Sequence, residues 1–223
     1  TTAPDTSITA KPSDPSNSSS ATFSFSSPDS TATFECQIDG GLWEDCESPQ
    51  PYTGLSDGSH TFKVRAKDTA GNTDTSPDSY TWTITTSNPT VTLTTTATSP
   101  TNTAFTVTAT FSETVTGFDS SDISVTGGTA GTVTSVSGAI YTFTVTPITQ
   151  GTVTVSIGAN RATDAAGNGN TVSNTLSLTY DTTAPDTSIT AKPSDPSNSS
   201  SATFSFSSPD STATFECQID GGL

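Results

Sequence analysis

The chain has 223 residues, of which 29% are apolar and 13% charged, and its 22 acidic and 6 basic side chains give a formal net charge of −16. This length accommodates two domains of about 100 residues, and the low apolar content favours small sandwiches with thin cores over one large core. So acidic a surface excludes nucleic acid and anionic membranes as partners. Its expected charged partners are cations, calcium above all. Alternatively, the negative charge only keeps the protein soluble and makes neighbouring parts of a fibre repel each other.

Alternating apolar residues in the first part of the chain predict short β-strands that each bury one face. Turn signals at residues 39–41, 56–58 and 70–72 separate them at the spacing of a sandwich with about seven strands. The apolar rows are Ala21, Phe23 and Phe25; Phe34, Cys36 and Ile38; Phe62, Val64 and Ala66; and Tyr80, Trp82 and Ile84. We therefore predict an immunoglobulin-like (Ig-like) β-sandwich over residues 1–87.

The second part of the chain, residues 88–181, has the same period of two in a different sequence. Its rows are Val91 and Leu93; Phe105, Val107, Ala109 and Phe111; Ile123 and Val125; Tyr141, Phe143 and Val145; Val153, Val155 and Ile157; and Leu176, Leu178 and Tyr180. So many aligned aromatic and β-branched residues disfavour a disordered Thr/Ser-rich linker. A second Ig-like sandwich is the predicted structure.

An exact internal repeat sets the domain organisation. Residues Thr1 to Leu42 recur without change from Thr182 to Leu223, so the period is 181 residues. That period is far longer than a solenoid unit, and we predict an all-β array of tandem Ig-like sandwiches arranged as beads on a string. Residues 182–223 then form the first part of a repeated domain of the first type. They supply about three strands, which either a continuation of the chain or a neighbouring subunit must complete.

Two cysteines flank the first predicted turn. A hairpin centred on Gly41 places Cys36 and Cys46 directly opposite each other on neighbouring strands, within the distance that a disulfide bridges. We predict this disulfide, which fits an oxidising, extracellular compartment. A metal site is the weaker alternative, because no histidine lies at ligand spacing. Cys217 is the repeat copy of Cys36.

The element D-x-A-G-N occurs near the end of each predicted sandwich. One interpretation is a hairpin turn alone, because Gly and Asn tolerate positive φ and Asp caps the local backbone. The other adds calcium, held by carboxylate and amide oxygens of the two turns and of the linker after the second sandwich. The candidate ligands are Asp68, Asn72, Asp74, Asp164, Asn168, Asn170, Asp181 and Asp186. The spacing is not that of an EF-hand loop.

Other polar residues carry weaker signals. The acidic group of Glu113, Asp119 and Asp122 fits a solvated loop better than an acid–base pair, because the sequence shows neither a cleft nor a raised pKa. His60 is the only histidine, and a Ser-His-Asp assignment in a chain so rich in Ser and Asp is expected from chance. Trp43 is the one candidate for an exposed sugar platform.

Two resemblances to known families follow from longer motifs. Residues 34–84, with FECQIDGGLWEDCESP, YTGLSDGSHTFKVRAKDTAGNTD and SYTWTI, resemble one family of bacterial Ig-like domains of long secreted and surface proteins. Residues 89–170, with FTVTATFSETVTGFDSSDISVTGGT, YTFTVTP and ATDAAGNGN, resemble a second such family, common in giant adhesins. The resemblances imply two alternating domain types, an architectural role and no catalytic residues.

The leading hypothesis is a structural, non-catalytic repeat segment of a secreted bacterial filament or giant surface adhesin. Its expected partners are further copies of itself, as continuing repeats or neighbouring subunits, together with a surface glycan or a host or cell target. The alternative is a spacer or carbohydrate-binding module of a large secreted glycan-active enzyme. No run of about 18 apolar residues is present, so no membrane insertion is expected. The chain has neither Met nor a signal peptide, and we interpret it as an internal segment.

Overall fold

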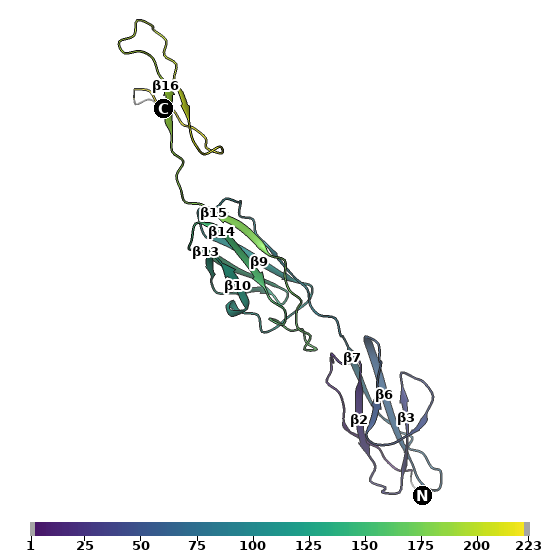
Figure 1. Cartoon of the computed structure of the whole chain (residues 1–223). Helices are drawn as coiled ribbons and strands as arrows, with labels where there is room; N and C mark the ends of the chain where they lie inside the picture. Colours follow the sequence, from purple (N-terminus) through teal and green to yellow (C-terminus); the bar gives the residue numbers. More distant parts are fainter. Residues whose placement is uncertain (1–2, 221–223) are drawn as a thin grey trace. The chain divides into compact units, whose positions relative to one another are not determined.

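The computed structural model describes residues 3–220, and in this part of the chain the regular structure is β-strand apart from one short 3-10 helix. Residues Thr1–Tyr180 form one compact unit and Asp181–Leu223 form another. The predicted all-β fold of Ig-like sandwiches is confirmed (Figure 1).

The first sandwich, drawn in purple to blue in Figure 1, packs a three-stranded sheet against a four-stranded sheet. The strand orders are β1-β2-β5 and β4-β3-β6-β7. The bounds are β1 Ser7–Ala10, β2 Ala21–Ser26, β3 Thr33–Ile38, β4 Glu44–Cys46, β5 Gln50–Tyr52, β6 Gly58–Lys67 and β7 Asp78–Ile84.

The second sandwich has the orders β11-β13-β9-β8, with β12 also on β13, and β10-β14-β15. The bounds are β8 Val91–Thr94, β9 Phe105–Phe111, β10 Ile123–Thr126, β11 Gly128–Ala130, β12 Thr134–Ser137, β13 Ile140–Pro147, β14 Gly151–Ile157 and β15 Leu176–Tyr180. A single 3-10 turn, η1 Ser120–Asp122, precedes β10.

The two sandwiches differ in the sheet that their middle strands join. In the first, β4 pairs with the third strand, β3. In the second, β11 and β12 pair with β13, which places them in the sheet of the first two strands. The second arrangement is that of constant-type immunoglobulin domains, whose fourth strand lies beside the fifth. The two sequence types therefore correspond to two strand topologies.

Each sandwich has its own hydrophobic core, and the two cores share no residue. The apolar side chains that the sequence predicted to be buried point inward. Along β2, β6, β9 and β13 they alternate with residues that are more exposed to solvent. At the centre of the first core, Phe23 stacks on Phe62 with ring centroids 4.1 Å apart and meets Trp82 edge-on at 5.1 Å. The exact boundary between the two sandwiches, which the sequence places between residues 87 and 88, stays a prediction.

The segment after the first strand of each sandwich crosses to the last strand. Ser16 forms a parallel bridge with Ile84, and Thr101 forms one with Tyr180. The amide of Ser16 donates to the Thr83 carbonyl over 2.9 Å, and the amide of Thr101 donates to the Thr179 carbonyl over 2.9 Å. In each sandwich the segment that follows the first strand is thus hydrogen-bonded beside the last strand.

The second unit contains the repeat copy of the first 42 residues. Its two strands, β16 Ser188–Ala191 and β17 Ser205–Ser207, pair in the register of β1 and β2. The predicted third strand is absent from its described residues, because residues 214–219 lack neighbours equivalent to β4 and β6, which flank β3 in the first sandwich. Gly221 and Gly222 of the predicted final turn lie outside the described residues.

Candidate functional site

The structure joins Cys36 to Cys46, the pair expected from the sequence, by a disulfide with a Cα–Cα distance of 5.8 Å. The predicted register is wrong, however. Cys36 lies opposite Glu44, so the two cysteines are diagonal neighbours rather than directly opposed. The amide of Gly41 donates to the Ile38 carbonyl over 2.9 Å, which centres the turn on residues 39 and 40 rather than on Gly41. Both central residues have positive φ, 50° and 73°, as a two-residue hairpin turn requires.

Removing this disulfide is expected to destabilise the first sandwich. Replacing Cys36 and Cys46 with alanine should lower its free energy of unfolding by about 2–3 kcal/mol, because the short loop is no longer closed in the unfolded chain. Both tryptophans, Trp43 and Trp82, lie in this sandwich, so urea denaturation followed by tryptophan fluorescence reports on it alone. The control is Cys217→Ala, which removes an exposed free thiol. An equal shift in this control would contradict the loop-closure explanation.

The two D-x-A-G-N elements fold as the same turn. Asp68 accepts hydrogen bonds from the backbone and side-chain nitrogens of Asn72, each over 2.8 Å. Asp164 accepts the equivalent pair from Asn168, also over 2.8 Å. The glycine of each element has φ near 90°, 89° in the first and 91° in the second, a conformation that favours glycine. In each turn the aspartate carboxylate therefore accepts its hydrogen bonds from the asparagine of the same turn.

The same hydrogen bonds act on the pKa of both aspartates. The side chain and then the backbone of Asn72 hold the pKa of Asp68 below its ordinary value. Burial raises the pKa of Asp164, but the hydrogen bonds from Asn168 and Ala166 outweigh it and also hold that pKa below its ordinary value. Both carboxylates are therefore ionised at neutral pH, the opposite of what a general acid requires.

The residue two positions beyond each of these asparagines is buried. Asp74 is 4% exposed and accepts hydrogen bonds from the amide and hydroxyl of Ser76 over 2.8 and 2.9 Å. Asn170 is 1% exposed, and both ends of its amide are hydrogen-bonded to the backbone. Its partners are Gly158, Arg161, Ala162 and Thr171. These two calcium candidates are thus parts of the folded core.

Asn168 also reaches the segment that precedes its own sandwich. Its Nδ2 donates to the carbonyl oxygen of Thr85 over 2.8 Å. The amide of Thr85 donates in turn to the Ser16 carbonyl of the first sandwich over 3.0 Å. Asn88 adds a hydrogen bond to the carbonyl of Gly169 over 2.6 Å. The recurring D-x-A-G-N element could be recognised in the sequence. The hydrogen bond from its asparagine, Asn168, to Thr85 in the segment that joins the two sandwiches could not.

The remaining calcium candidates lie in the second unit. Asp181 accepts a hydrogen bond from the amide of Thr183, and Asp186 accepts one from the amide of Thr187, each over 2.9 Å. Among residues 3–220, no three His, Cys, Asp or Glu side chains gather in a group that could hold a metal ion. Calcium binding at the eight candidate residues stays a prediction, and calorimetry with calcium and then with chelator tests it.

His60 connects two turns of the first sandwich. It is 7% exposed, and its Nδ1 lies 2.7 Å from Oδ2 of Asp39 while its Nε2 lies 2.7 Å from the Ser56 carbonyl oxygen. Both partners are acceptors, so both ring nitrogens donate and the imidazolium form fits best. The hydrogen bond to Ser56, followed by that to Asp39, raises the pKa of His60 above its ordinary value of about 6.5. Within residues 3–220, the partners of the imidazole are thus a carboxylate and a backbone carbonyl, and neither is a serine hydroxyl.

This arrangement predicts a pH dependence of stability. Because the pKa of His60 is raised in the folded state, the imidazolium stabilises the sandwich fully below pH 6.5, and this contribution is lost as the pH rises through the folded-state pKa. We expect a loss of about 1 kcal/mol in the unfolding free energy measured by tryptophan fluorescence. The variant His60→Gln, which does not titrate, should remove the slope. A slope that persists in this variant would assign the effect to another group.

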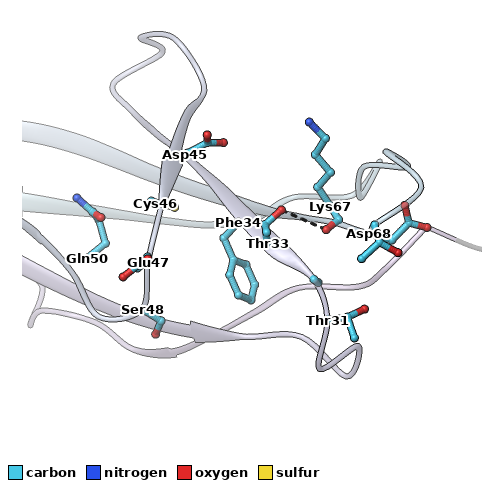
Figure 2. Close-up of a pocket in the computed structure, with 12 residues that line it drawn as sticks. Thr31, Thr33, Phe34, Asp45, Cys46, Glu47, Ser48, Gln50, Lys67 and Asp68 are labelled. Carbon is cyan, nitrogen blue, oxygen red and sulfur yellow. Dashed lines mark hydrogen bonds between the residues drawn. The ribbon is translucent and has the colours of Figure 1, made fainter.

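A groove of about 1070 Å³ lies beside the disulfide, where β4 forms the edge of its sheet. In Figure 2 the Phe34 ring and the Lys67 side chain lie on opposite sides of the strands, as their register requires. The charged side chains that line the groove are Asp45, Glu47, Lys67 and Asp68. Its net negative charge favours a cation over an anion.

The other two candidates have structural roles. The Arg65 guanidinium lies 4.3 Å from the centre of the Trp43 ring and also pairs with Glu35 at 2.7 Å, so one face of this tryptophan is covered. Asp119 and Asp122 form a reciprocal capping box around η1, with hydrogen bonds of 2.7 Å from the Ser121 amide and 2.9 Å between the two aspartates. They form an exposed loop rather than an acid–base pair.

Comparison with known proteins identifies the second sandwich. Residues 85–180 match a family described as a bacterial Ig-like domain. This segment is therefore a bacterial Ig-like domain, as its motifs implied. No curated protein sequence matches the chain. Within residues 3–220, no helix has the length and hydropathy needed to cross a membrane.

Several solved structures are similar at low identity. A structure of a 1.5-MDa bacterial ice-binding adhesin is 16% identical, with 87% of this chain and 71% of that chain covered and a TM-score of 0.45. A tetra-tandem repeat from the extending region of a large adhesion protein is 17% identical, with coverages of 92% and 56% and a TM-score of 0.36. The Bacteroides ovatus protein SGBP-B, in complex with a mixed-linkage heptasaccharide, is 16% identical, with coverages of 80% and 48% and a TM-score of 0.25.

Proposed function

We propose that the chain is a non-catalytic, structural repeat segment of a secreted bacterial filament or of the stalk of a giant surface adhesin. The observation that carries this proposal is the exact return of Thr1–Leu42 as Thr182–Leu223 after two complete sandwiches. An array built in this way gains length with each added period, because every period has its own cores. Further copies of the same period are its main partners.

Two features of the first sandwich and its joining segment support this role. The Cys36–Cys46 disulfide fits an extracellular location, where disulfides persist. The segment between the sandwiches is short and is hydrogen-bonded on both sides of Thr85, to Ser16 and to Asn168. Such a joint restricts bending more than a free linker of polar residues does.

The alternative role, a spacer or carbohydrate-binding module of a glycan-active enzyme, has less support. A sugar platform requires an open aromatic face, and Arg65 covers one face of Trp43. The groove beside β4 is lined largely by polar and charged side chains, with a single aromatic ring, Phe34. We therefore do not propose glycan binding as the main function.

Electron microscopy of proteins with two and four copies of the 181-residue period tests the proposal. We expect thin, extended particles whose contour length doubles from the first protein to the second. Small-angle scattering of the same samples, with calcium and with chelator, measures whether the predicted calcium sites change stiffness. Compact particles whose size does not follow the number of periods would overturn the stalk role.

A further inference from the structure

The two D-x-A-G-N turns differ in the residue that follows the asparagine. Asn168 is the only asparagine in the sequence that precedes a glycine, Gly169, whereas Asn72 of the first sandwich precedes Thr73. The backbone nitrogen after an asparagine can attack the side-chain amide carbon, and glycine has no Cβ to hinder this approach. The β-branched side chain of Thr73 shields the equivalent nitrogen. The turns therefore share a fold but differ in chemical reactivity.

Gly169 lies where a larger residue does not fit. A Cβ at this position would overlap the side chain of Asn160 and would lie 3.1 Å from the Asn160 Cα. Asn160 has a φ of 57°, and its amide donates to the Asn170 carbonyl over 2.9 Å, so this close neighbour is held in place. The packing of the second sandwich thus favours glycine after Asn168, although glycine makes that asparagine reactive.

The side-chain amide of Asn168 is buried and fully engaged. Asn168 is 8% exposed, and its partner Asp164 is 5% exposed. The Nδ2 of Asn168 donates to Oδ2 of Asp164 and to the carbonyl oxygen of Thr85, each over 2.8 Å. These two bonds use both hydrogens of the amide nitrogen. Attack by the backbone nitrogen therefore requires the turn to open, and the hydrogen bonds slow the reaction in the folded chain.

We propose that Asn168 is a site of spontaneous deamidation, and that its conversion to aspartate or isoaspartate releases Thr85 from the second sandwich. The Gly169 nitrogen bonds to Cγ of Asn168, and the side-chain nitrogen leaves as ammonia with the proton of the Gly169 amide. Water then opens the resulting succinimide ring. Opening at Cγ gives aspartate, opening at the backbone carbonyl carbon gives isoaspartate, and neither step needs an oxidant or a reductant. The inference goes beyond the stalk role and does not depend on it.

Neither product can make the contacts of the asparagine. An ionised carboxylate has no hydrogen to donate, so the carbonyl of Thr85 loses its hydrogen bond. The new negative charge also lies beside the carboxylate of Asp164 in a buried position, where like charges repel strongly. In isoaspartate the main chain is one carbon longer, which displaces the remaining hydrogen bonds of the turn. Both products therefore weaken the hold on the segment that precedes β8.

Ageing of the full chain tests the site. The chain is incubated in mildly alkaline buffer with chelator and digested at intervals, and mass spectrometry locates each amide that has become an acid. We expect Asn168 to be modified first, while Asn72 stays intact over the same period. Unfolding in guanidinium chloride should speed the reaction at Asn168 at least about threefold, because the protecting hydrogen bonds are lost. An Asn168 that stays intact in the folded chain, or another asparagine that is modified earlier, would overturn the assignment.

A pair of matched variants tests the release of Thr85. Asn168→Asp reproduces one product, and Asn102→Asp adds the same charge at an exposed position of the same sandwich. Chelator is present throughout, so that no metal binds the new carboxylate. We expect Asn168→Asp to lower the calorimetric Tm of the second sandwich by at least about 5 °C. A broad-specificity protease should also cut residues 85–90 faster in this variant and in the aged chain than in the fresh chain.

The variant Asn102→Asp should change neither the Tm nor the rate of cleavage. Equal behaviour of the two variants would show that added charge alone is responsible and would overturn the release of Thr85. An aged chain that is modified at Asn168 but is cut at residues 85–90 no faster than the fresh chain would overturn it as well.

Discussion

Replacing Phe23 with alanine is expected to lower the free energy of unfolding of the first sandwich by about 3–5 kcal/mol. The ring is fully buried, stacks on Phe62 at 4.1 Å and lies edge-on to Tyr52, Tyr80 and Trp82. Its loss removes the aromatic contact at the centre of a thin core and leaves a cavity that the two sheets fill only in part. Urea denaturation followed by tryptophan fluorescence measures the change.

The repeat offers a control for this substitution. Phe204 has the same neighbours in sequence as Phe23 but is 47% exposed. The variant Phe204→Ala should therefore leave the tryptophan-detected transition unchanged within about 0.5 kcal/mol. If the two variants shifted this transition equally, burial in the first core would not be the cause of the loss.

The second large effect is expected at Asn170. Its Oδ1 accepts hydrogen bonds from the amides of Arg161 and Ala162 over 2.7 and 2.8 Å, and its Nδ2 donates to the carbonyls of Gly158 and Thr171 over 2.9 and 2.7 Å. The variant Asn170→Ala leaves these backbone groups without partners in a buried position. We expect a loss of about 3–5 kcal/mol in the stability of the second sandwich.

The measurement also separates this structural role from calcium binding. The second sandwich contains no tryptophan, so its unfolding is followed by calorimetry rather than by fluorescence. The variant Asn170→Ala should shift this unfolding transition even in the presence of chelator. The exposed position Asn102 lies in the same sandwich, and Asn102→Ala is the control, with no expected shift. A loss that appears only when calcium is present would favour metal binding over the hydrogen-bond explanation.

The core of both sandwiches could be predicted because period-two burial is a local property. Phe105, Val107 and Ala109 alternate with threonines in the sequence and lie inside for that reason. The turns at the D-x-A-G-N elements were predictable on the same basis, because Asp68 and Asn72 satisfy each other within five residues. Local chemistry is sufficient for features of this kind.

Features that depend on distant partners could not be predicted. The segment TFECQI forms strand β3 at residues 33–38 but no strand at residues 214–219, although the letters are the same. Strand formation there is decided by β4 and β6 rather than by propensity. For the same reason, neither the diagonal register of Cys36 and Cys46 nor the contact from Asn168 to Thr85 could be inferred from spacing.

The parallel bridges at Ser16 and Thr101 have a consequence for how each sandwich responds when its two ends are pulled apart. Ser16 donates to Thr83 and accepts from Thr85, so the segment that follows β1 is hydrogen-bonded to the end of the last strand while running in the same direction. Tension applied to the ends then slides these segments along each other and loads the hydrogen bonds together, in shear. Antiparallel neighbours pulled from one end would instead peel apart one bond at a time. Because each sandwich has its own core, we expect a chain of such sandwiches to extend under tension in discrete steps, one sandwich at a time.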